Sequence, residues 1–206
     1  MIEKLQEKMN QEGMWYEDST FFDWVQNEML LMKNADLEKL FKEILNEEKF
    51  TAWNRGNFYT FRYNYKNEPK SKFVPSFDRQ PLIYLLKQEG QILHGFNLNY
   101  LNPTVFLKPF MHDLYSFYYG NFDEDESSSN SRILATYRNI ERYDRLFISK
   151  VIYRKYTLKN INAVKVIPKR FAKIYACLGN GIFPRASKGS VYAATNKHIN
   201  YKRSQR

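Results

Sequence analysis

The sequence predicts an α+β protein with an acidic helical N-terminal arm, a small antiparallel β-sheet, and a basic helical C-terminal region with an extended tail. Three observations support this prediction. Apolar residues recur at helical spacing in residues 1–50, aromatic residues alternate with period two from residue 57, and the charge changes sign along the chain. The sheet is expected either to curl or to close into an SH3-like barrel.

Composition bounds the class of protein. The chain has 206 residues, of which 43% are hydrophobic and 17% aromatic, so it is long and apolar enough to bury a core. Its single cysteine, Cys177, excludes an internal disulfide and a cysteine-based zinc site. The first residues mix charges without an apolar run, and no stretch has the composition of a membrane-spanning helix. We therefore expect a soluble intracellular protein with no membrane partner.

The net charge of +10 is unevenly distributed. Residues 1–50 hold 12 acidic and 6 basic residues, whereas residues 151–206 hold 13 basic residues and no acidic one. A basic segment of this kind attracts polyanions through counterion release. The alternative is that the lysines and arginines only keep an exposed tail in solution. The sequence favours contact with nucleic acid.

Residues 1–50, the acidic arm, are expected to be helical. Thr20 followed by Asp23 matches a capping box for a first helix. In the next helix the apolar side chains follow the spacing i, i+3, i+4, i+7, i+8: Leu37, Leu40, Phe41, Ile44 and Leu45. An acidic amphipathic hairpin either packs as a subdomain or docks into a partner's groove.

Residues 51–120 are expected to form the small β domain and one helix. Side chains of residues 57–65 alternate with period two, which predicts a strand. The segments on either side of Glu89-Gly90 are expected to pair as a hairpin. Gly95 in the returning strand indicates a bulge or a close backbone approach. After Asn102-Pro103 the pattern becomes helical up to residue 120.

The remainder divides into three predicted segments. Residues 121–131 form an acidic serine-rich linker, 132–183 a basic helical region, and 184–206 a basic flexible tail. Within the second segment, a helix begins at Pro168 and ends at Gly179. A secondary basic stripe recurs there at i, i+4 and i+7: Arg138, Arg142 and Arg145.

No motif in the sequence indicates catalysis, a metal or a cofactor. Glycine-rich phosphate loops are absent, and the three histidines, His94, His112 and His198, lack metal-ligand spacing. We therefore expect no enzymatic activity, no cofactor and no small-molecule substrate. A nuclease that assembles distant carboxylates such as Asp78 and Asp113 is the enzymatic alternative.

Two residue types in the last quarter are candidates for nucleic-acid contact, because cations neutralise phosphates and aromatic rings stack on bases. The candidate phosphate ligands are Arg154, Lys155, Lys159, Lys165, Lys169, Arg170, Lys173, Arg185, Lys188, Lys197, Lys202, Arg203 and Arg206. The candidate stacking residues are Tyr153, Tyr156, Tyr175 and Tyr201.

One part of the chain carries a family pattern of the form Y-x-P-K … Y-D-x-x-P-L … G-x-N-x-x-Y-L-P. The matching residues are Tyr65, Lys66, Asp78, Pro81, Leu82, Gly95, Asn97, Tyr100, Leu101 and Pro103. The pattern resembles the DNA end protector group of large tailed bacteriophages, with Phe77 and Asn99 as departures from it. The resemblance implies a virion or packaging protein that binds linear DNA ends, in the host cytoplasm and the virion.

Two hypotheses follow. The first is a non-enzymatic DNA-binding phage protein that acts on genome ends during packaging or at the head exit channel. The second is a structural subunit of the neck, tail or baseplate, whose basic tail binds acidic neighbouring subunits. Both have other virion or packaging proteins as partners.

Overall fold

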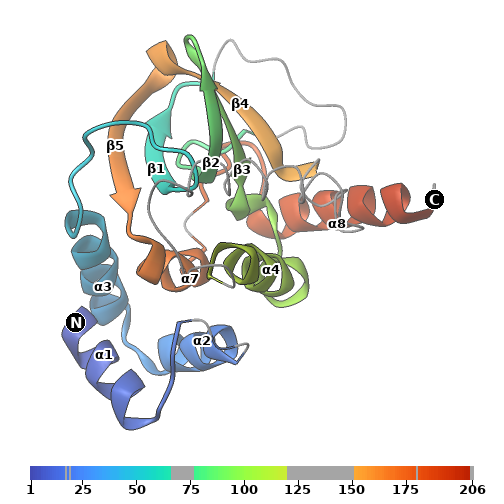
Figure 1. The fold of residues 1–206 in the computed structure, drawn as a ribbon. Coiled ribbons are helices and arrows are strands. Elements are labelled where there is room, and N and C mark those ends of the chain that lie inside the picture. Colours follow the sequence, from blue (N-terminus) through green and yellow to red (C-terminus); the bar gives the residue numbers. More distant parts are fainter. Residues whose placement is uncertain (17, 19, 66–76, 120–150, 180, 205–206) are drawn as a thin grey trace.

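A computed structural model describes residues 1–16, 18, 20–65, 77–119, 151–179 and 181–204. Among these, an open five-stranded antiparallel sheet is covered by helices, which confirms the predicted α+β class (Figure 1). Three predicted features lie outside the described residues: the acidic linker over 121–131, the stripe of Arg138, Arg142 and Arg145, and the phosphate candidate Arg206.

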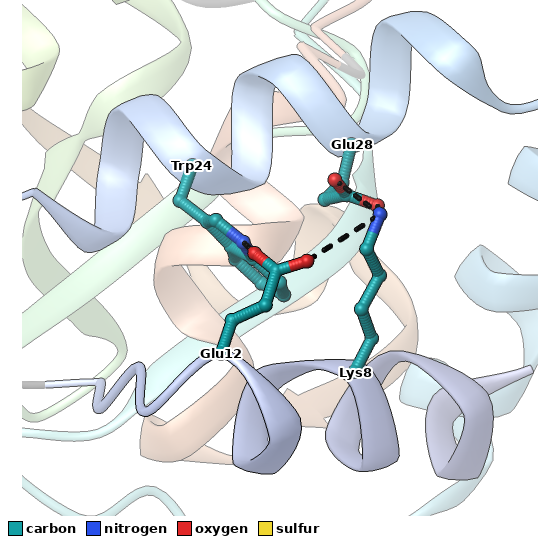
Figure 2. A network of polar contacts seen from close by, with 4 residues as sticks. All are labelled: Lys8, Glu12, Trp24 and Glu28. Atoms are coloured by element: carbon teal, nitrogen blue, oxygen red, sulfur yellow. Dashed lines mark hydrogen bonds and ion pairs between the residues drawn. The ribbon is translucent and has the colours of Figure 1, made fainter.

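The acidic arm forms three helices, α1 (Ile2–Gln11), α2 (Phe21–Leu31) and α3 (Asn34–Asn46). Figure 2 shows how polar side chains connect the first two. Lys8 Nζ lies 2.7 Å from Glu28 Oε2 and 3.8 Å from Glu12 Oε1, and Trp24 Nε1 donates to Glu12 Oε2 at 2.6 Å. These contacts fix α1 against α2 at the surface.

The predicted capping box of α2 is wrong. Thr20 has helical backbone angles, φ −87° and ψ −15°, and makes no side-chain cap hydrogen bond. Asp23 instead pairs with Lys108 at the start of α4. A capping box requires an extended N-cap residue, and Thr20 is not extended. Asp23 is therefore engaged in a tertiary ion pair and not in a cap.

The sheet contains β1 (Phe58–Tyr63), β2 (Leu82–Glu89), β3 (Ile92–Asn97), β4 (Tyr153–Thr157) and β5 (Ile161–Ile167). Their order is β4-β3-β2-β1-β5. The predicted hairpin is confirmed, with Gly90 at φ 54° in its turn. Gly95 lies beside a register shift, and a Cβ added there would be 3.0 Å from the Tyr84 carbonyl oxygen, as a close backbone approach predicts.

The expectation of a basic helical region over 132–183 holds for only part of its described residues: a helix follows Pro168, but β4 and β5 are strands and supply both edges of the sheet. β-Branched residues are frequent from Tyr153 to Ile167 and favour strands over helix. A three-residue 3₁₀ turn, Leu158–Asn160, joins the two edges. So short a connection spans at most roughly 15 Å, so the two edge strands must approach each other and the sheet curls. β4 and β5 do not pair, so the sheet is not closed into a barrel.

Helix α4 lies between β3 and β4 in the chain, and two further helices follow β5. A π-helical turn, Pro103–Leu107, leads into α4 (Lys108–Tyr119), and α7 (Lys169–Cys177) ends at Gly179, which has φ 57°. The last helix, α8 (Lys188–Ser204), replaces the extended tail expected over 184–206. Its buried residues recur every four positions, so one face packs on the core: Val191, Thr195 and Ile199.

Both faces of the sheet are buried. The helix-covered face belongs to a core that includes Phe96 of β3, Phe171 of α7 and Ile199 of α8. The concave face encloses a second, aromatic core in which Tyr59 and Trp53 have ring centroids 4.8 Å apart. Residues that reach solvent from the sheet therefore lie at its edges and turns.

Candidate nucleic-acid interface

The acidic arm packs on the first part of the basic C-terminal quarter. Helix α2 contacts α7, and α3 contacts both β5 and α7. Arg170 Nη2 lies 2.8 Å from Glu47 Oε2, and Lys165 Nζ donates to Asn46 Oδ1 at 3.2 Å. The opposite charges at the two ends of the sequence therefore partly neutralise each other within the fold.

Two other predicted phosphate ligands, Lys169 and Lys173, are more buried at the same contact. Lys173 is 2% exposed, donates to the Tyr16 carbonyl oxygen and lies 5.7 Å from the Phe21 ring centroid. Burial lowers the pKa of Lys169 to about 8, against a smaller opposing effect of Glu48. The assignment of Lys173 to phosphate contact is wrong, because its ammonium serves to hold the arm on α7.

Arg154 also has a structural role. Its Nη1 donates to the carbonyl oxygens of Val151 at 2.8 Å and Tyr153 at 2.7 Å. The guanidinium lies 4.3 Å from the Tyr100 ring centroid, a cation–π distance. Arg154 therefore holds the start of β4, and its predicted role as a free phosphate ligand is corrected.

The four predicted stacking tyrosines separate into two groups. Tyr156 and Tyr175 are each 1% exposed, and Tyr175 is stacked on Phe41 at 5.1 Å, so neither ring is available to a base. Tyr153 is partly exposed, and Tyr201 is 51% exposed on α8. Tyr156 and Tyr175 fail as stacking residues because Tyr156 occupies an inward position of β4 and Tyr175 an inward position of α7.

The other predicted phosphate ligands face outward. They are exposed, and none pairs with a carboxylate among the residues that the structure describes: Lys155, Lys159, Arg185, Lys188 and Lys197, here called the outward cations. Lys188 Nζ donates to the Gly179 carbonyl oxygen, which leaves its charge uncompensated. The side chains of Lys202 and Arg203, on the last turn of α8, lie outside the description.

Two residues of the family pattern, Asp78 and Asn97, meet in a buried polar cluster, in which Asp78 is 1% exposed. Its Oδ1 accepts from the backbone N–H groups of Gln80 at 2.9 Å and Ile182 at 2.8 Å. Its Oδ2 accepts from the side-chain amides of Asn99 at 2.6 Å and Asn97 at 3.4 Å. Burial raises the pKa of Asp78, although all four donors oppose that rise.

These bonds define the role of Asp78. A carboxylate has about four lone-pair sites, and the protein fills them here. Asp78 thus connects its own loop to the end of β3 and to the segment after α7. The nuclease alternative used Asp78 as a metal ligand, and that use conflicts with these contacts. Asp113 belongs to α4, and its side chain is outside the description.

One polar cluster was not predicted from the sequence. His94 of β3 is 3% exposed; its Nδ1 contacts the Tyr153 hydroxyl on β4, and its Nε2 lies 3.1 Å from Glu89 Oε2. Lys155 lies directly opposite His94 in the β3–β4 register. Burial lowers the pKa of His94, against the attraction of Glu89. Hairpin register predicts the nearness of Glu89 and His94, but no local signal indicates Tyr153.

Metal sites and membrane-spanning helices have no candidate among the described residues. No group of three or more His, Cys, Asp or Glu side chains is arranged to hold a metal ion there. No described helix has both the length and the apolar character that crossing a membrane requires. Comparisons with models of protein families, with curated proteins and with solved structures found no match.

Proposed function

We propose that the protein binds DNA through the outward cations and does not hydrolyse it as a nuclease would. The observation that carries this proposal is the division of the basic quarter. The cations on α7 and β5 contact the acidic arm, whereas the outward cations, which lie on β4, on the following turn and on the α8 segment, are exposed and pair with no carboxylate among the described residues. Solubility alone would not require the unpaired basic residues to be concentrated in one part of the fold.

The resemblance to the DNA end protector group makes this proposal more specific. Linear genome ends, bound during packaging or at the head exit channel, are the DNA that such a protein would meet. Tyr201, exposed beside the basic end of α8, is suited to stack on a terminal or unpaired base. Preference for ends over closed circles is the property that separates this function from general adhesion to DNA.

Charge-removing variants test the proposal. In the outward variant, Lys155, Lys159, Arg185, Lys188 and Lys197 are all changed to Gln. In the inward control, Lys165→Gln and Arg170→Gln remove two cations that contact the arm. Fluorescence anisotropy with a labelled linear duplex at 100 mM salt measures affinity for wild type and both variants. Melting temperatures confirm that each is folded.

We expect at least a tenfold loss of affinity in the outward variant and less than a twofold change in the control. Unlabelled linear DNA should compete better than the same mass of closed circular DNA. Equal losses in both variants would contradict the assignment of the interface. Equal competition by circles would contradict the specificity for ends.

A second candidate is a structural subunit of the virion. The observation that favours it is a set of exposed apolar side chains on the arm, with Leu30 83%, Leu31 78% and Trp15 62% exposed. Exposed apolar patches are typical of protein interfaces. On this account the isolated protein binds no DNA at 100 mM salt, and the outward cations contact acidic neighbouring subunits in the particle.

A further inference from the structure

We propose that Tyr153 is a nucleophile that joins the protein covalently to a phosphate of bound DNA, with His94 as its general base. This inference rests on the proposed function, because it requires DNA to lie along β4. It adds a chemical step that the exposed cations do not supply.

The first support is the order of the three side chains. Glu89 Oε2 lies 3.1 Å from His94 Nε2, and the opposite ring nitrogen, Nδ1, contacts the Tyr153 hydroxyl. A carboxylate at Nε2 favours the tautomer that carries its proton on that nitrogen. The lone pair of Nδ1 then faces the phenol and accepts its proton. A nucleophile, a base and a group that orients the base are the arrangement that activates hydroxyl nucleophiles.

The second support is the environment of His94. Its side chain is 3% exposed and burial lowers its pKa, so the ring is neutral near pH 7 and available as a base. Glu89, which is 57% exposed and also pairs with Lys87, stabilises the imidazolium once the proton has moved. The charged groups facing the ring are Lys87 and Glu89 from β2 and Lys155 from β4.

The third support is the position of a phosphate-binding cation. Tyr153 and Lys155 lie on the same face of β4, about 7 Å apart along the strand. Lys155 is exposed and lies opposite His94 in the register. Its flexible ammonium can therefore hold the phosphate that Tyr153 attacks and neutralise the charge that develops on the phosphate oxygens.

Other tyrosine hydroxyls of the fold have different environments. The Tyr59 hydroxyl accepts the backbone N–H of Asn54 at 2.7 Å, and that of Tyr63 accepts the N–H of Thr157 at 3.2 Å. Backbone donors of this kind hold a phenol in place without removing its proton. The contact between Tyr153 and an imidazole nitrogen is chemically distinct from both.

The reaction balances without a further reagent. The Tyr153 oxygen forms a bond to phosphorus as its proton moves to His94 Nδ1. The phosphorus–oxygen bond to one deoxyribose breaks, and that oxygen leaves as a hydroxyl after taking a proton from water or from Lys155. The products are a phosphotyrosyl diester and a free DNA hydroxyl. One phosphodiester is exchanged for another, with no oxidation or reduction.

The test uses full-length protein and linear DNA labelled at either the 5′ or the 3′ end. Binding is measured first by anisotropy. The mixture is then denatured in detergent, and label that migrates with the protein is quantified across pH 6–9. Tyr153→Phe removes only the hydroxyl, His94→Gln removes the base, and Tyr65→Phe, just beyond the end of β1, is the control. Peptide mass spectrometry locates the modified residue.

We expect labelled protein from wild type and Tyr65→Phe, none from Tyr153→Phe, and about a hundredfold slower labelling from His94→Gln. Binding without covalent label at any pH would overturn the nucleophile and leave the proposed function intact. Label that persists in Tyr153→Phe would also overturn it. Absence of binding in the first step would overturn the proposed function and this inference together.

Discussion

The buried carboxylate of Asp78 gives the sharpest test of the fold. Asp78→Asn keeps the size of the side chain but exchanges one carboxylate oxygen for an amide NH₂ group. If the remaining oxygen still accepts from Gln80 and Ile182, the new NH₂ group faces the amide donors of Asn99 and Asn97. A flip of the Asn99 amide would restore one contact only by giving up its bond to the Gln80 carbonyl oxygen.

The magnitude follows from the donors left unpaired. Each buried unsatisfied donor costs about 1–3 kcal/mol. Loss of the short bond from Asn99 carries the full cost, and loss of the 3.4 Å bond from Asn97 carries only part of it. The variant no longer buries a charge, which offsets some of this cost. We therefore expect the free energy of unfolding to fall by about 2–4 kcal/mol, a large fraction of the roughly 5–15 kcal/mol usual for a domain.

Urea unfolding at pH 7, followed by tryptophan fluorescence, measures this loss. Asp18→Asn is the control, because Asp18 accepts one exposed backbone bond, from Trp15, and its loss should cost less than about 1 kcal/mol. A fall below 1 kcal/mol for Asp78→Asn would refute the structural role. So would a variant of wild-type stability that loses DNA binding selectively.

Three further changes test other parts of the account. Lys169→Met should raise stability at pH 7 and flatten the pH dependence of stability. Because the pKa of Lys169 is lowered to about 8 in the fold, the wild type gains stability between pH 8 and 10.5, where the unfolded chain loses its extra proton. Parallel profiles of urea midpoint against pH for variant and wild type would contradict this. Gly95→Ala should cost about 1–3 kcal/mol in urea unfolding, because its Cβ would lie 3.0 Å from the rigid Tyr84 carbonyl oxygen; an unchanged midpoint would count against the close approach. Tyr156→Phe should leave DNA affinity within twofold, because the ring is 1% exposed and cannot stack on a base. A tenfold loss of affinity in an anisotropy titration would return Tyr156 to the interface.

Local patterns in the sequence predict much of the secondary structure. The amphipathic spacing of α3, the alternation in β1 and the Glu89-Gly90 turn each reflect a single element, and each prediction is confirmed. The helix after Pro168 and its end at Gly179 are also confirmed. In these cases the residues that define the element are neighbours along the chain.

The sequence was less informative where an element depends on distant partners. β4 and β5 are strands because they pair with β3 and β1, about 60 and 100 residues away along the chain. α8 has few apolar residues, and its helix depends on a core face that other elements provide. Charge along the chain likewise did not indicate which cations the arm would cover, since Lys173 and Lys155 look alike in sequence but differ in burial.

The same limits decide how the DNA interface is best tested. A truncation after Lys150 would remove both edge strands together with α7 and α8, and with them a large share of the core. Loss of DNA binding in that fragment would report unfolding. Point substitutions at exposed cations keep the fold and therefore report on the interface.

The salt dependence of DNA affinity tests the central claim most directly. Each phosphate contact contributes about −0.9 to the slope of log affinity against log salt, so five outward cations predict a slope of about −4.5 for wild type on a linear duplex between 50 and 200 mM salt. The outward variant should lose most of that slope, and the inward control should keep it. A flat response for wild type, or the same slope in the outward variant, would contradict the account.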